Sequence, residues 1–229
     1  MKTTYCIVCG SKDFKTNEVL WPELIQEWNL NEEEALYVNM QQGFACKRCG
    51  NNLRSMVLAR ALLDLLGSGG SLDRASRRFR YRKLRILEVN EAGNLSPFLS
   101  RFSGHRLVSY PESDMTSLQF DDGYWDLIIH SDTLEHIPEP LAALRECWRV
   151  LRVGGACIFT VPIIIGRMSR SRDGMKPSYH GNPVMPAEDY RVATEFGADV
   201  WTYVMKAGFK SCKFYSQNYP AGIAVEAIK

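Results

Sequence analysis

The hydrophobic pattern of the chain is clearest over residues 120–162, where three elements follow one another. Mostly apolar side chains fill residues 124–130 and give way to a polar cluster, which predicts a short strand with that cluster at its carboxyl end. Two prolines then suit the first turn of a helix, whose apolar spacing continues until Gly154 and Gly155 stop it. Residues 156–161 return as a second apolar strand. The segment therefore predicts strand, helix and strand.

A parallel pair of strands joined by a helix indicates an α/β fold with a mostly parallel sheet. Residues 84–89 predict a further buried strand, residues 194–208 a helix, and residues 209–216 and 222–228 a closing pair of strands. In open α/β sheets ligands bind beyond the carboxyl ends of the strands. The polar cluster therefore lies where a binding site is expected.

Composition limits the classes of protein that remain. The chain has 229 residues, of which 45% are hydrophobic, so it can bury a sizeable core as one domain or as one domain with a small module. Lysine plus arginine exceed aspartate plus glutamate by only 28 to 26, so net charge favours neither nucleic acid nor a membrane surface. No secretory leader opens the sequence, and its longest apolar run is about half as long as a membrane-spanning helix. We expect a soluble cytoplasmic protein.

Four of the seven cysteines form a repeated motif. Cys6 and Cys9, like Cys46 and Cys49, are two residues apart and are followed by glycine. This spacing lets two thiolates face one ion, and four thiolates complete a tetrahedron with no open position, which predicts a structural zinc site. Disulfides or iron are the less favoured readings. Residues 1–52 are therefore interpreted as a ribbon-like zinc module, which either clamps the chain or docks a partner.

Residues 53–83 are expected to link this module to the rest of the chain. Asn51 or Asn52 can cap a helix there, and residues 74–85 carry seven basic side chains and no acid. A solvated connector is the favoured interpretation of such a run. The alternative is a grip on a nucleic-acid backbone.

The central block also carries a resemblance. The sequence YWDLIIHSDTLEHI, followed by ALRECWRVLRVGG and an apolar strand that closes in Pro162, resembles the fourth and fifth strand units of class I S-adenosylmethionine-dependent methyltransferases. The resemblance covers residues 84–229. It implies a Rossmann-like domain with helices on both faces, an antiparallel last strand, and S-adenosylmethionine as the cofactor.

The resemblance also implies where the cofactor binds. Glu88 and Val89 match an acidic residue that is followed by a glycine-rich loop, within which Asn90 replaces a glycine and Gly93 is the single glycine. Asparagine tolerates the left-handed backbone better than other residues with side chains, which keeps close approach of the cofactor open. The alternative is that the altered loop has lost the cofactor, leaving a binding protein without catalytic activity.

Further contacts are expected at the next two strand ends. Glu112 and Asp114 both stand near the spacing expected for a ribose-binding carboxylate, and spacing does not choose between them. By resemblance, Asp114 and Met115 contact the adenine, while His130 and Ser131 line the methyl-donor pocket. The interval from Glu88 to residue 126 is short for two further strand units, so we expect one of them to be trimmed or merged.

Two histidines are candidates for the chemistry. His180 lies in a long polar loop after the fifth strand of the resemblance and is the preferred general base, with a solvent-facing role as the alternative. His136 is a second candidate, and it can instead organise the start of the following helix.

The expected acceptor is a small molecule. Arg167, Arg170, Arg172 and Lys176 in the same loop suggest that it is anionic, such as a glycan or nucleotide-sugar precursor. The runner-up is methylation of nucleic acid or protein, with the zinc module and the basic connector as the docking surface.

Overall fold

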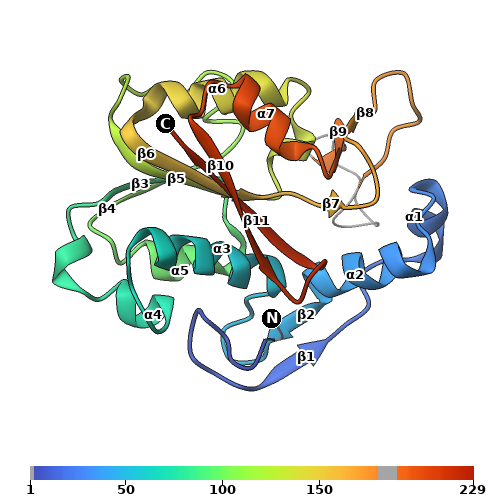
Figure 1. Cartoon of the computed structure of the whole chain (residues 1–229), viewed down its shortest axis with the longest axis horizontal. Helices are drawn as coiled ribbons and strands as arrows, with labels where there is room; N and C mark the ends of the chain where they lie inside the picture. The colour runs from blue at the N-terminus through green and yellow to red at the C-terminus, as the bar shows by residue number, and fades with distance from the viewer. Residues whose placement is uncertain (1–2, 180–189) are drawn as a thin grey trace.

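The structure is a computed structural model that describes residues 3–179 and 190–229. At its centre lies one six-stranded sheet (Figure 1), whose strands in pairing order are β10 (Ser211–Gln217), β11 (Gly222–Ile228), β6 (Leu151–Thr160), β5 (Trp125–Ser131), β3 (Arg85–Val89) and β4 (Gly104–Val108). The last four run parallel, whereas β11 is antiparallel to both of its neighbours. The predicted mostly parallel α/β sheet with an antiparallel closing strand is confirmed.

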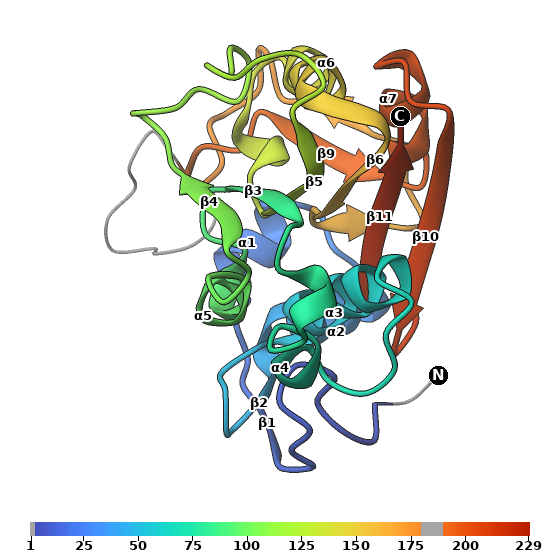
Figure 2. The same cartoon turned by 90° about the vertical axis from the view of Figure 1, so that its left-hand side faces the viewer.

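Helices cover both faces of this sheet (Figure 2). The helix α3 (Leu53–Leu65) packs on the face that carries Ile86, whereas α6 (Pro140–Val150) and α7 (Val200–Lys206) pack on the face that carries Leu87. Successive side chains of a strand point to opposite faces, so the apolar strands feed two cores at once. Short helical segments lie between these elements: α4 (Leu72–Ala75), η1 (Phe79–Tyr81), η2 (Gly93–Leu95), α5 (Ser96–Leu99) and η3 (Leu134–His136).

The boundaries of α3 and α6 follow from local chemistry. Asn52 caps α3 by accepting a hydrogen bond from the Ser55 N–H at 3.0 Å, and Pro140 opens α6. The pattern predicted that Gly154 and Gly155 end this helix. The helix ends earlier, at Val150, because Leu151 is already extended and pairs with Trp125. The strand expected at 156–161 is thus longer and starts at residue 151.

The segment between β4 and β5 contains no strand in residues 109–124. The sheet therefore passes directly from β4, its edge strand, across β3 to β5. A single strand, β4, lies between β3 and β5, which agrees with the expectation that one strand unit is trimmed or merged in this interval.

The amino-terminal part of the chain is small, and contacts with the closing strand pair help to hold it in place. It contains a two-stranded ribbon, β1 (Phe14–Thr16) with β2 (Phe44–Cys46), and an insert between these strands. Thr3 reaches the turn between β10 and β11, where its N–H donates to Asn218 Oδ1 at 2.7 Å and its hydroxyl accepts from Gln217 Nε2 at 2.7 Å. The start of the chain is thereby tied to the closing hairpin.

The insert folds as two helices, α1 (Pro22–Glu27) and α2 (Glu32–Gly43). Asn31 and Glu34 form a reciprocal capping box that starts α2. Trp28 is only 5% exposed and belongs to the same hydrophobic core as α3, so the insert packs against the rest of the chain.

A three-stranded sheet follows β6. It consists of β7 (Ile163–Ile164), β9 (Thr194–Gly197) and β8 (Arg170–Ser171), with β9 in the middle. The prediction of a helix over 194–208 is wrong in its first half, because residues 194–197 pair with strands on both sides. Only the stretch that forms α7 is helical.

The amino-terminal module and the sheet share one hydrophobic core. Ile7 and Val8, at most 2% exposed, cluster with the apolar face of α3 and with sheet residues such as Ile86. The division into residues 1–52, 53–83 and 84–229 stays a prediction, since α3 packs on the sheet as well as joining the parts. Within the described residues, no helix has the length and apolar composition that a membrane crossing requires.

Candidate functional site

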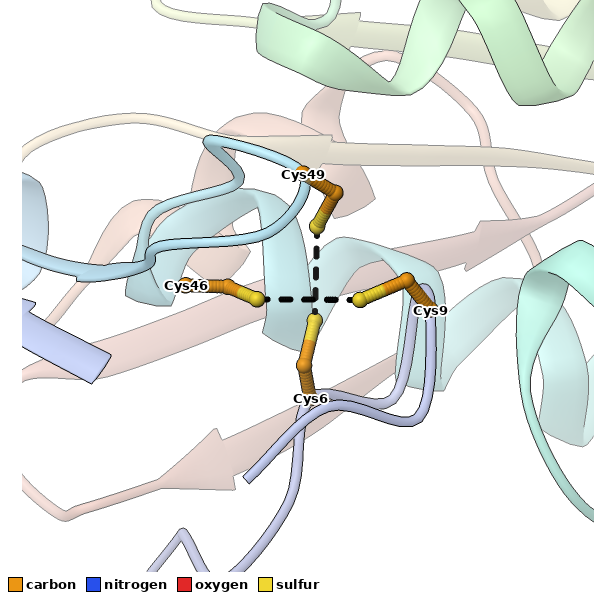
Figure 3. Close-up of side chains that lie close together, drawn as sticks. All are labelled: Cys6, Cys9, Cys46 and Cys49. Atoms are coloured by element: carbon orange, nitrogen blue, oxygen red, sulfur yellow. Dashed lines mark hydrogen bonds between the residues drawn. The ribbon is translucent and has the colours of Figure 1, made fainter. Parts of the chain in front are cut away.

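The four motif cysteines converge on one point (Figure 3). Their Sγ atoms all lie within 4.8 Å of one another, and Cys6 faces Cys49 at 3.6 Å while Cys9 faces Cys46 at 3.6 Å. A tetrahedral zinc–thiolate centre has Zn–S bonds of about 2.3 Å, which place its sulfurs roughly 3.8 Å apart. The four thiols therefore have the spacing of a tetrahedral metal site.

Two matched turns create this geometry. Gly10 donates its N–H to the Cys6 carbonyl at 2.7 Å, and Gly50 donates to the Cys46 carbonyl at 2.9 Å. Both glycines have a positive φ, +81° and +71°, which other residues rarely adopt. Each turn thereby returns its second cysteine toward the first.

Hydrogen bonding and burial shift the pKa values of two of these thiols in opposite directions. The hydrogen bond shared with Cys6, and then the one from the Asn51 amide, lowers the pKa of Cys49 to about 4, while burial raises the pKa of Cys9 to about 11. Cys49 thus ionises more readily than Cys9. A bound dication would favour the thiolate form of the other three as well.

A buried carboxylate organises the turn after β3. Glu88 is fully buried, and its carboxylate accepts hydrogen bonds from the Ala92 N–H at 2.9 Å, from the Ser96 hydroxyl, and from His105 Nε2 at 2.7 Å in its charged or Nε2-protonated form. These bonds fold residues 89–96 back over the strand end. Val89, the last residue of β3, is itself buried.

Asn90 joins three strand ends. It adopts a left-handed backbone (φ +54°), donates its N–H to the Val108 carbonyl at 2.8 Å, and accepts from the Tyr110 N–H at 3.1 Å. Its side-chain amide also donates to Thr133 Oγ1 at 3.3 Å. The expectation that asparagine can replace glycine in this turn is met in its backbone conformation, and the ends of β3, β4 and β5 share one polar edge.

The glycine of the turn lies against α3. Gly93 has a φ of +59°, and a Cβ at this position would come within 2.6 Å of Ser55 Oγ. Any larger residue would push the turn away from the helix.

The loop after β4 presents its acids to solvent. Glu112 and Asp114 are both exposed, and Asp114 Oδ1 accepts from the Thr116 N–H at 2.7 Å and hydroxyl at 2.8 Å. Met115, in contrast, is 4% exposed and packs in the core beneath α6. The two acids are open to a ligand, while Met115 holds the loop down.

The two residues at the end of β5 differ in orientation. His130 lies fully in the core, where its ring stacks on Phe159 at 4.9 Å and burial lowers its pKa to about 4, so the imidazole is neutral at pH 7. Neither of its nitrogens has a hydrogen-bond partner in the described residues. Ser131 lies toward the α3 face and shares a 2.7 Å hydrogen bond with Thr160.

An ion pair that sequence analysis missed lies at the same edge. Arg54, on the first turn of α3 and only 2% exposed, pairs with Asp132 directly after β5. Its Nε has no hydrogen-bond partner in the described residues. Arginines on helices are usually exposed, so no sequence signal marked this one.

The candidate chemical histidines have separate fates. His136 Nδ1 lies 3.0 Å from the Arg191 carbonyl and His136 Nε2 lies 3.8 Å from the Glu135 carboxylate, so this ring joins the strand edge to the returning loop. His180 lies outside the described residues.

Acids of the chain itself neutralise the arginines of the loop after β6. Arg167 pairs with Glu34 at 2.6 Å, and Arg170 pairs with Glu195 at 2.6 Å. Arg172 also pairs with Glu195, and it lies 3.7 Å from a third acid, Glu27. The sequence-based suggestion of an anionic acceptor therefore loses three of its four cations, because these side chains hold the insert and β9 in place.

The chain is similar to known methyltransferases over part of its length. Residues 63–159 match the family described as "Methyltransferase domain". The chain is 42% identical over 62 residues to a demethylmenaquinone methyltransferase of Roseiflexus castenholzii, covering 26% of each chain. It is 29% identical over 160 residues to a ubiquinone/menaquinone biosynthesis C-methyltransferase of Xanthomonas axonopodis pv. citri, covering 60% of each.

A sarcosine/dimethylglycine N-methyltransferase of Halorhodospira halochloris is 39% identical over 57 residues, or 25% of this chain and 20% of that protein. The chain thus spans between 20% and 60% of the length of these three relatives. Among solved structures, a Thermotoga maritima protein described as a S-adenosylmethionine-dependent methyltransferase, possibly acting on histamine nitrogen, is 15% identical with a TM-score of 0.42, over 77% of this chain and 93% of that one.

Proposed function

This chain carries a class I S-adenosylmethionine-dependent methyltransferase domain, and from that premise we propose that it transfers the donor's methyl group to a small organic acceptor. The polar edge at the ends of β3, β4 and β5, joined by Asn90 above the buried Glu88, is the observation that supports this most directly. It combines backbone groups, carboxylates and a cation at one end of a parallel sheet, where such folds bind ligands.

The groups at this edge suit the parts of the donor. S-adenosylmethionine supplies a sulfonium-activated methyl group, an adenosine, and an amino acid end. The backbone of the turn at Asn90 and Gly93 can contact the amino acid end of the donor. The buried Nε–H of Arg54 can donate a hydrogen bond to the carboxylate of that end. Glu112 or Asp114 remains the candidate for the ribose hydroxyls.

Positioning is the main catalytic contribution of the chain in this proposal. The edge has to align the acceptor with the methyl group and exclude water, for which oriented groups on rigid strand ends are suited. An acceptor that loses a proton also needs a base, and His180 is our sequence-based candidate. We expect His180→Ala to lower turnover at saturating acceptor, and unchanged turnover would remove that assignment.

We favour an acceptor without phosphate groups. The pairing of Arg167, Arg170 and Arg172 with acids argues against a phosphorylated glycan precursor. Two of the relatives are named for methylation in quinone biosynthesis or of demethylmenaquinone, and one for sarcosine and dimethylglycine nitrogen, which supports a small organic acceptor.

Titration calorimetry with S-adenosylhomocysteine tests the proposal. We expect saturable binding at one site per chain, weakened in either Glu112→Gln or Asp114→Asn according to which acid meets the ribose. Asp121→Asn, an exposed acid further along the same loop after β4, is the matched control. Absence of binding would favour the reading that the altered turn has lost the cofactor.

We also propose that the four cysteines hold one structural zinc ion. The support is the sulfur spacing, the thiolate-only ligand set, and the absence of a fifth neighbouring group of ligating type among the described residues. Mass spectrometry of the native protein is expected to show one zinc per chain, and Cys46→Ser is expected to lose it. A fully folded protein without metal would contradict the proposal.

A specific observation keeps nucleic acid as a second candidate partner. Phe79 is 81% exposed, and the neighbouring Arg77, Arg78, Arg80 and Arg82 are exposed as well. Exposed aromatic rings among cations suit single-stranded nucleic acid. An affinity for RNA that falls steeply with salt concentration, and that is lost when these arginines are replaced by alanine, would support this candidate. If RNA does not bind at any salt concentration, the segment is a solvated connector.

A further inference from the structure

The turn that follows the second cysteine pair contacts the turn that follows β3. Asn51 stands two positions after Cys49 and is fully buried. Its amide nitrogen lies 3.4 Å from Cys49 Sγ and donates to the Asn94 carbonyl at 3.0 Å. One side chain therefore touches both a metal-ligand sulfur and the turn assigned to the methyl donor.

Two further contacts press the same surfaces together. A Cβ at Gly50 would lie 2.8 Å from the Asn94 amide nitrogen, and one at Gly93 would lie 2.6 Å from Ser55 Oγ. Gly50 belongs to the second cysteine turn, and Ser55 to the first turn of α3. Their close approach leaves little room for one turn to shift without the other.

We propose that Asn51 is a positioning residue that couples metal occupancy of the cysteine cluster to binding of the methyl donor. The inference rests on the proposed function. A bound metal fixes the position of the Cys49 sulfur, and the fixed sulfur accepts the hydrogen bond of the Asn51 amide and so orients that amide toward the Asn94 carbonyl. Loss of the metal frees Cys49 and removes that anchor from the turn.

Thermodynamic linkage makes the coupling reciprocal. If metal tightens donor binding, then a bound donor tightens metal binding by the same factor. The metal affinity is therefore a direct readout that requires neither turnover nor an identified acceptor.

The test measures the dissociation constant for zinc by competition with a chromogenic chelator, with and without saturating S-adenosylhomocysteine. In the native protein we expect S-adenosylhomocysteine to tighten zinc binding by about five-fold or more. In Asn51→Ala this ratio should fall close to one. Lys47→Ala is the control, because Lys47 is an exposed residue of the same turn whose ion pair is with Asp13, and it should keep the native ratio.

Asn51→Ser guards against a variant that fails to fold. A serine hydroxyl is too short to reach both the sulfur and the Asn94 carbonyl, so this protein should hold one zinc per chain and still lose the ratio. A native ratio in either folded Asn51 variant would overturn the coupling, as would a ratio of one in the native protein that binds both ligands. If the zinc-loaded native protein binds no S-adenosylhomocysteine at all, the proposed function itself fails, and the coupling with it.

Discussion

Glu88 is a charged side chain with no exposure to water, and it is stabilised by the turn that it folds. A buried carboxylate is costly unless hydrogen bonds compensate it, and here three groups of the chain donate or can donate to it: the Ala92 N–H, the Ser96 hydroxyl and His105. The hydrogen bonds of the carboxylate thereby hold the turn in its conformation. Its contribution to donor binding would act through the backbone it positions.

Replacing Glu88 by alanine therefore has two expected effects. Buried donors lose their acceptor, which should lower the free energy of unfolding by about 2 kcal/mol or more. The turn should also loosen, which weakens S-adenosylhomocysteine binding. Urea unfolding and calorimetry measure the two quantities, and Glu91→Ala, an exposed neighbour, should change neither. Equal effects of both substitutions would contradict the role given to Glu88.

At the scale of single residues, the sequence predicted which residue types matter but not which residues they contact. The cysteine spacing predicted the four-thiol cluster, and the tolerance of asparagine for positive φ predicted the turn at Asn90. The sequence analysis did not identify Arg54, because its ion-pair partner, Asp132, lies far along the chain. His130 was placed at the right strand end, but which way its ring would point depends on the register of β5 against its neighbours.

Among the elements, α1 and α2 depend on one arginine from the loop after β6. Arg167 donates to both oxygens of Glu34, at 3.0 and 2.6 Å, and to the Trp28 carbonyl at 2.8 Å. Trp28 in turn donates its indole N–H to Ser178 at 2.7 Å. The insert is therefore fastened to the region that leads away from the polar edge.

Arg167→Ala should destabilise the protein in a pH-dependent way. The hydrogen-bonded guanidinium lowers the pKa of Glu34 below its ordinary value of 4.5, so the stabilisation is fully present above that value and is lost as the pH falls through the lowered pKa. We expect a loss of about 2 kcal/mol at pH 7, shrinking under acid conditions. Unfolding curves from pH 7 to pH 3 provide the measurement.

Glu34→Gln is the matched comparison for that series. Glutamine keeps the size and an acceptor oxygen but does not titrate, so the effect of adding Arg167→Ala should no longer shrink in acid. A pH dependence that survives in the Glu34→Gln background would show that another group is responsible.

Elements with their own local signals were the predictable ones. The strand, helix and strand around residues 125–160 follow from hydrophobic spacing and from Pro140. The stretch at 194–197 resembled a helix in sequence and became β9, because β7 and β8 supply hydrogen-bond partners that the local pattern does not contain. Gly197 adds to this, since a Cβ there would lie 2.1 Å from the Arg167 carbonyl oxygen.

Over the whole molecule, the cysteine module lacks a core of its own. Ile7 and Val8 pack into the cluster that α3 and the sheet share. Removing the metal should therefore lower the stability of the entire chain, and heating the chelator-treated protein should give one cooperative transition at a reduced temperature by circular dichroism. A separate early transition, with the rest unfolding at its native temperature, would show instead that the module melts alone.

The contact between Thr3 and the turn at Gln217 and Asn218 has a consequence for the order of folding. It joins positions 215 residues apart, whereas 36 residues separate Cys9 from Cys46. The entropic cost of closing a loop grows with its length, so the two cysteine turns can meet at a lower cost than Thr3 and its partners. We therefore expect the cysteine cluster to assemble before the closing hairpin captures Thr3.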